Sequence, residues 1–170
     1  MTIEDFHRTV DMWLTQLERY SFAEICAKPS LKSWSLGQVI MHLVAETNFY
    51  LQQINICISS NENSHEEATI NAKMLFSKNA LPDQIIEGPA SNLLVSQAES
   101  KSQLQHSLRD LKDAFDEVSV RMLKSSFHGK SKHPGLGFFS ASEWFQFAEM
   151  HLRHHLKQKE RIERFLHIKN

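Results

Sequence analysis

The sequence predicts an all-α protein, a four-helix bundle with one long crossover connection. The 170 residues include only five glycines and four prolines, and runs that alternate apolar and polar residues, as strands do, are almost absent. Four long segments instead carry apolar residues at alternating spacings of three and four, which is the period of an amphipathic helix. A chain of this length builds one core, so residues 1–170 are expected to form a single domain.

The first two helices have recognisable start and stop signals. The first follows Thr2, a suitable N-cap, and should end before Pro29 because the residue preceding a proline is pushed out of helical geometry. The second begins at "SLGQ", where Ser35 and Gln38 form a capping box, and its apolar pattern continues to Ile58.

A long polar connection separates the second helix from the third. Residues 59–90 contain polar clusters and two prolines, although "EEATINAKMLF" within them is compatible with a short helix. Such a length, about 30 residues, predicts a crossover that leaves helices two and three parallel. The third helix has an apolar seam over residues 104–122, and a glycine-containing loop, "FHGKSKHPGLGFF", follows it. The fourth begins with a capping box of Ser140 and Glu143 and runs toward Ile168.

Composition limits the partners that we expect. The 19 basic and 20 acidic residues leave no broad basic surface for a nucleic acid. No segment reaches the 18 or so apolar residues of a membrane span, and the opening "MTIEDFHRTV" lacks the basic segment of a signal peptide. The sequence therefore predicts a soluble cytoplasmic protein with reduced thiols, no nucleic-acid partner and no membrane partner.

The most informative segment is "EMHLRHHLKQ" in the fourth helix. On a helical wheel that advances about 100° per residue, His151 and His155 lie about 40° apart in the middle of the apolar face. Arg153 and Lys157 lie on the opposite side, and His154 lies on the flank. The cationic residues therefore belong to the solvated face, whereas two of the three histidines point inward.

Two inward imidazoles one turn apart need partners for their ring nitrogens. Side chains at positions i and i+4 are close enough to converge on one ion, so a metal is one such partner. A hydrogen-bonded histidine pair that fixes the register of the bundle is the alternative.

His42 in the second helix is the candidate third ligand. The wheel places it at the edge of the apolar face, in a column with Glu46 one turn below. Glu46 is expected either to accept a hydrogen bond from the second nitrogen of an imidazole or to be an ordinary surface residue.

Two stretches resemble the DinB/YfiT-like superfamily of metal-binding four-helix bundles. "SWSLGQVIMHLVAETNFY" is similar to the second helix of the family, in which a tryptophan and a Ser-Leu-Gly-Gln turn precede a ligand histidine. "HPGLGFFSASEWFQFAEMHLRHHLKQKERI" is similar to its final helix, especially in a branch of uncharacterised function with a His-Pro loop and a His-x-x-His-His-Leu-x-Gln segment. The resemblance extends over the whole chain.

This resemblance implies a ligand set and an assembly. It implies that His42, His151 and His155 bind the metal, and all three positions are histidine here. Gln158 matches a recurring glutamine and is a candidate partner of a ligand, as are Glu46 and His154. The family also implies a homodimer.

The resemblance and the ligand set together suggest a reaction class. Three histidines leave a coordination position open, as in catalytic zinc sites, and imidazole also suits nickel, iron and copper. Zinc or nickel is therefore the expected cofactor. Characterised relatives include thiol-dependent transferases and isomerases, so the resemblance implies a metal-dependent transferase with a small thiol as cosubstrate. A metal-dependent hydrolase that uses bound water and a non-catalytic metal-binding or stress-response protein remain the alternatives.

Overall fold

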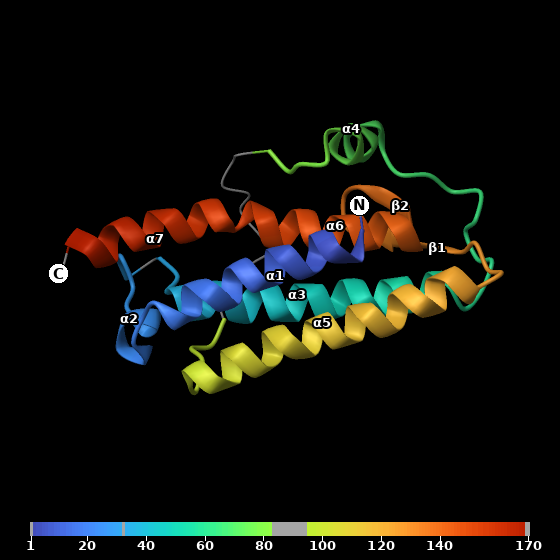
Figure 1. Ribbon diagram of the computed structural model, residues 1–170. Helices are drawn as coiled ribbons and strands as arrows, with labels where there is room; N and C mark the ends of the chain where they lie inside the picture. Colours follow the sequence, from blue (N-terminus) through green and yellow to red (C-terminus); the bar gives the residue numbers. More distant parts are fainter. Residues whose placement is uncertain (1, 32, 83–94, 169–170) are drawn as a thin grey trace.

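The computed structural model describes residues 2–31, 33–82 and 95–168, with side chains as far as residue 165. It confirms a four-helix bundle. The bundle is formed by α1 (Ile3–Glu18), α3 (Leu36–Cys57), α5 (Lys101–Lys124) and a rod in which α6 (Ala141–His154) is continued by α7 (Leu156–Ile168). α3 packs against α5 and α6, and α1 packs against the other sides of the same two helices. Figure 1 shows that α3 and α5 run in the same direction, as the crossover predicts.

Side-chain caps set where the helices begin. Thr2, Ser35 and Ser140 each accept a hydrogen bond from the backbone N–H three residues later, and each belongs to a capping box. A fourth capping box, at Ser21, starts the short helix α2 (Phe22–Cys26). The first expected helix is therefore two helices, because Ser21 satisfies the N–H groups of a new helix start.

The core is apolar and aromatic where α1, α5 and α6 meet. The rings of Phe6 and Phe115 stack with their centroids 3.9 Å apart. Trp13 Nε1 donates a hydrogen bond of 3.1 Å to the carbonyl oxygen of Leu152, so the buried indole N–H is satisfied across the bundle. This packing fixes α6, and with it the histidines that α6 carries, relative to α1.

The segment between α5 and α6 is a hairpin and not a loop. β1 (Lys130–His133) pairs antiparallel with β2 (Gly137–Ser140). The backbone of residues 67–69 lies against the hairpin, because Phe138 N–H donates to Glu67 O (3.1 Å) and Thr69 N–H donates to Leu136 O (2.9 Å). A Cβ atom on Gly137 would lie 2.7 Å from the Glu67 carbonyl oxygen, so this approach requires glycine.

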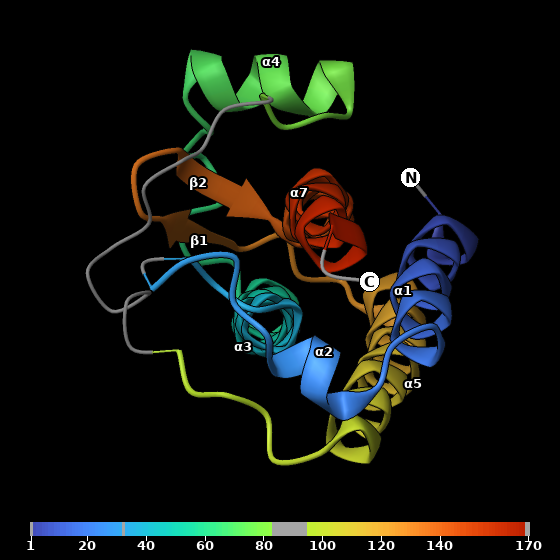
Figure 2. The same cartoon turned by 90° about the vertical axis from the view of Figure 1, so that its left-hand side faces the viewer.

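The crossover helix lies on the outside of the bundle. α4 (Ile70–Lys78) starts at the N-cap Thr69, inside the segment expected to be helical, and Figure 2 shows it outside the four main helices. Two side chains of α6 hold its C-terminal end: Gln146 Nε2 donates to Phe76 O (3.0 Å) and Arg153 Nη2 donates to Asn79 O (2.8 Å). The crossover is thus tied to the α6–α7 rod, which carries two of the candidate ligands.

Among the residues that the structure describes, no helix is both long enough and apolar enough to cross a bilayer.

Candidate metal centre

Three histidines meet between α3 and the α6–α7 rod. His42 is buried on α3, with 7% of its surface exposed, and His151 and His155 are half-buried near the junction of α6 and α7. Each offers one ring nitrogen, and these three atoms lie within 4.8 Å of one another. The ring of His42 is 5.3 Å from that of His151 and 5.2 Å from that of His155, measured between centroids. The structure therefore brings together the three side chains that the sequence singled out.

The spacing of His151 and His155 fits a shared ion. Their Nε2 atoms are 3.2 Å apart. Two nitrogens that each bind one metal at about 2.0 to 2.1 Å with tetrahedral angles would be separated by ~3.3 Å. The observed distance also permits an N–H···N hydrogen bond, which was the alternative partner for this pair. His42 adds a third ring nitrogen to this pair, so the three together form a group that could hold one cation.

The fourth expected helix is interrupted at one of these residues. α6 ends at His154 and α7 begins at Leu156, so His155 stands between them with φ −73° and ψ −10°. Its N–H still donates to His151 O (3.3 Å), and its carbonyl oxygen accepts from Lys159 N–H (3.0 Å). The rod therefore continues through His155 with helical hydrogen bonds on both sides of this residue. The sequence pattern gives no sign of the interruption because both segments keep one apolar face.

Burial keeps the three imidazoles uncharged. Loss of solvation lowers the pKa of His42, although the nearby Glu46 carboxylate acts in the opposite direction. Burial, reinforced by the neighbouring His155 and His42, lowers the pKa of His151 well below its ordinary value. Burial also lowers the pKa of His155 to about 4, against the opposing effect of its hydrogen bond to Gln158. At neutral pH all three rings therefore have a lone pair to offer a cation.

Gln158 orients one of these rings. His155 Nδ1 and Gln158 Oε1 are 2.7 Å apart. Because an amide oxygen only accepts, this contact places the proton on Nδ1 and leaves the Nε2 lone pair directed at the cluster. The Nδ1 atom of His151 is buried and has no hydrogen-bond partner among the described residues.

Glu46 accepts a hydrogen bond from a neighbour on its own helix. Its Oε2 atom accepts a hydrogen bond from the Tyr50 hydroxyl (3.1 Å), one turn further along α3. The only hydrogen bond to Glu46 within the described residues is this one, so the expected bond to an imidazole is not observed there. Its negative charge opposes the lowering of the His42 pKa by burial.

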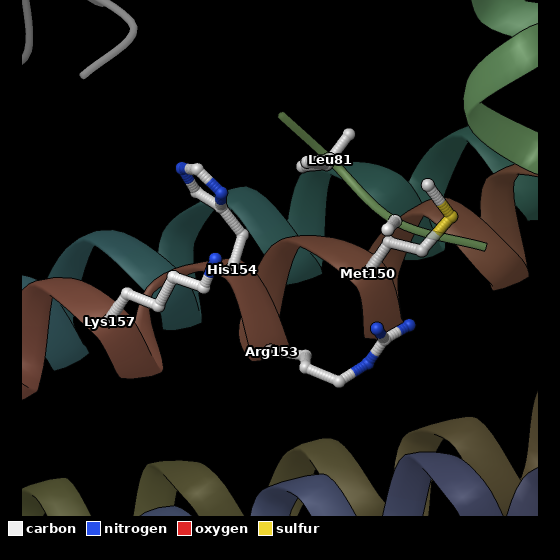
Figure 3. Close-up of a pocket in the computed structure, with 6 residues that line it drawn as sticks. Leu81, Met150, Arg153, His154 and Lys157 are labelled. Carbon is white, nitrogen blue, oxygen red and sulfur yellow. The ribbon is translucent and has the colours of Figure 1, made fainter. Parts of the chain in front are cut away.

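His154 faces another part of the surface. Its ring contacts His155 edge-on at 5.3 Å between centroids. It also lines a pocket of about 140 Å³ on the outer side of the rod. In Figure 3, His154 and Arg153 extend to opposite sides of the helix, and Leu81 of the crossover lies near Met150. None of the three clustered histidines lines this pocket.

Aromatic rings that were not among the candidate site residues border the histidine cluster. Trp34 packs on His42 with centroids 5.0 Å apart, Tyr50 meets His151 edge-on at 5.7 Å, and Phe147 stacks parallel to His151 at 6.4 Å. Their spacing from the histidines in the sequence is the signal that could have identified them as neighbours of the site. Trp34 directly precedes the Ser35 cap, whereas Tyr50 lies two turns from His42 and Phe147 one turn from His151 on the same helix.

The remaining described histidines lie elsewhere. His133 is on β1, and its ring packs against Phe139, Trp144 and Phe147. His106 is exposed on α5.

Comparison with known proteins connects this geometry to a family. No curated protein matches the chain. A solved structure described as "Crystal structure of TT2238, a four-helix bundle protein" is similar, with a TM-score of 0.52 and 14% identity over 94% of this chain and 98% of that one, which shows the fold alone. The family model of the DinB superfamily matches residues 5–158, a range that includes His42, His151 and His155. The chain therefore belongs to the DinB superfamily.

Proposed function

We propose that this protein binds a divalent transition metal, zinc or nickel, through His42, His151 and His155. The observation that supports this most strongly is the convergence of three uncharged ring nitrogens within 4.8 Å. Neutral imidazole is the form that binds metals, and two of these rings have pKa values lowered far enough to exclude protonation at neutral pH.

We further propose that an ion held by these three histidines would bind the sulfur of a low-molecular-weight thiol. The S–H proton would leave to solvent, and the sulfur could then form a bond to an electrophile as the leaving group of that electrophile departs. Three protein ligands leave room for an exogenous one, whereas structural zinc sites close with four. A divalent ion at such a position favours the thiolate over the thiol. Membership of a superfamily whose characterised members include thiol-dependent transferases and isomerases supports a thiol over water as that ligand.

The test starts from protein purified without an affinity tag, whose metal content is measured by elemental analysis. The loaded protein is then mixed with common small thiols and a chromogenic electrophile, with and without a chelator. Turnover that requires both thiol and metal is expected. A His151→Ala variant is the matched control, because it should keep the helices and lose the turnover.

Other results of this screen would replace the proposal. Metal-dependent ester hydrolysis without a thiol would instead indicate a hydrolase that uses bound water. A melting temperature that rises with metal, together with no turnover on any substrate, would indicate a non-catalytic metal-binding protein.

A further inference from the structure

α7 has few buried side chains that hold it in the bundle. Among the residues of α7 whose side chains are described, 156–165, only Lys159 and Ile162 are buried. α6, by contrast, buries an apolar series that includes Trp144 and Phe147. The position of α6 is therefore fixed by its own packing, whereas the position of α7 depends strongly on the contacts of a few side chains.

One set of contacts joins α7 to the segment between α1 and α2. Glu163 Oε1 lies 3.1 Å from Lys159 Nζ, one turn earlier on α7, and accepts a hydrogen bond of 2.9 Å from the Tyr20 hydroxyl. Tyr20 and Lys159 are buried, and the side chain of Glu163 is 14% exposed. We call these three residues the α7 clamp. Lys101 of α5 fixes the far end of the clamp, because its Nζ donates to the Tyr20 carbonyl oxygen (3.1 Å).

The α7 clamp begins one turn after a candidate metal ligand. Lys159 N–H donates to the carbonyl oxygen of His155 (3.0 Å), and the adjacent Gln158 makes the 2.7 Å contact with His155 Nδ1. The first turn of α7 therefore carries both a backbone partner and the side-chain partner of His155. A shift of α7 would move Gln158 and turn the ring of His155 relative to His151, which α6 holds.

A second clamp of the same chemistry joins α6 to α1. Glu149 Oε1 accepts a hydrogen bond from the Thr9 hydroxyl (2.8 Å) and another from Arg153 Nε (2.8 Å), one turn further along α6. In both clamps a carboxylate of the rod binds a hydroxyl from the N-terminal part of the chain and a cation four residues away. They differ in their surroundings, because the apolar packing of α6 would keep that helix in place without the Thr9 hydroxyl.

We propose that the α7 clamp positions His155 and thereby sets the affinity of the three-histidine site for its metal. Tyr20, Lys159 and Glu163 are positioning residues, which act on the ring of His155 through Gln158. The family match ends at residue 158, so Lys159 and Glu163 lie beyond it. This inference rests on the proposed function, since it needs an ion at the histidines.

The test compares Tyr20→Phe with Thr9→Val, because each variant removes one buried hydroxyl donor to a carboxylate of the rod. Competition with a chromogenic chelator measures the zinc affinity, and urea unfolding of the metal-free protein measures stability. Both variants should be less stable than the wild type. Tyr20→Phe should bind zinc about 10-fold more weakly, at the lower end of the 10- to 100-fold range for the loss of a ligand's partner. Thr9→Val should change the zinc affinity by less than about threefold.

Two further variants separate positioning from a general loss of stability. In a Gln158→Leu background, Tyr20→Phe should have little additional effect on zinc affinity, because residues that act through one another are not additive. Glu163→Gln keeps an acceptor for Tyr20 but loses the charge that pairs with Lys159. It should also weaken zinc binding more than Thr9→Val does, and it takes the place of Tyr20→Phe if that variant does not fold.

Each outcome has one meaning. Zinc affinities that are equal in Tyr20→Phe and Thr9→Val would overturn the role of the α7 clamp while leaving the metal site intact. The same fold-loss from Tyr20→Phe with and without Gln158 would overturn it too, because the clamp would then not act through Gln158. Failure of the wild-type protein to bind zinc would instead refute the proposed function, and the inference with it.

Discussion

The Nε2 atoms of His151 and His155 lie 3.2 Å apart, with the ring of His42 about equally distant from both imidazoles. Two successive turns of the α6–α7 rod and the facing helix α3 thus bring three ring nitrogens to one point. Because that point lies between α3 and the α6–α7 rod, an ion bound there would link two of the four helical rods. Metal binding and bundle stability should therefore be coupled.

Replacing His151 with alanine should abolish stoichiometric metal binding and leave the protein largely helical. Two ligands remain, which hold a divalent ion far more weakly than three, whereas the packing of Trp13 and Phe6 is untouched. Elemental analysis and far-ultraviolet circular dichroism measure the two effects. His106→Ala, on the exposed face of α5, is the matched control and should retain its metal. Unchanged metal content in His151→Ala would refute the assignment.

Gln158 should influence metal affinity although it does not bind the ion. Gln158→Leu removes the acceptor for His155 Nδ1, and loss of such a partner typically weakens metal binding by 10- to 100-fold. His154→Ala should change the affinity by less than about threefold, because His154 lines a different surface. Competition with a chromogenic chelator measures both constants. Equal losses in the two variants would contradict the assigned role of Gln158.

The metal-free protein should lose stability as the pH falls from about 6.5 toward 4. The folded state binds fewer protons than the unfolded chain in this window, because the pKa of His155 is about 4 when folded and about 6.5 when unfolded. Stability therefore rises with pH across the window and levels off above it. Urea unfolding of the wild type and of His155→Leu at pH 7, 5.5 and 4.5 tests this. Parallel losses in the two proteins would show that His155 does not contribute.

The sequence predicted the helices and the inward histidines because both follow from one periodicity. The apolar period that defines the fourth helix also placed His151 and His155 on its inner face, and the structure has them there. His42 lay at the edge of its helical face, so periodicity alone could not decide it. Its position relative to the other two histidines depends on how α3 and α6 pack. The family resemblance indicated that position, whereas the helical wheel did not.

The features missed by sequence reasoning depend on tertiary contacts. The hairpin of β1 and β2 has only four residues per strand and is stabilised partly by the backbone of residues 67–69, which are distant in sequence. The hydrogen bond from Tyr50 to Glu46 also depends on packing, and the sequence left Glu46 open between an imidazole partner and an ordinary surface position. Tyr50 is equally close along α3, and packing against Trp144 directs its hydroxyl to the carboxylate.

Gly137 should be much less tolerant of alanine than Gly135. Both have positive φ, +85° and +95°, so either substitution introduces backbone strain of about 1–3 kcal/mol. Only at Gly137 would the new Cβ also meet backbone, 2.7 Å from Glu67 O, whereas nothing lies within 4 Å at Gly135. Gly137→Ala should therefore lower the melting temperature further than Gly135→Ala. Equal shifts would mean that the hairpin does not hold the crossover as described.

X-ray absorption spectroscopy of the zinc-loaded protein tests the central claim most directly, together with the same measurement on His42→Ala. Three imidazole nitrogens at about 2.0 to 2.1 Å and at least one further light ligand are predicted for the wild type, with one imidazole fewer in the variant. A zinc ion whose surroundings are the same in both proteins would contradict the account, because His42 would then lie outside the site.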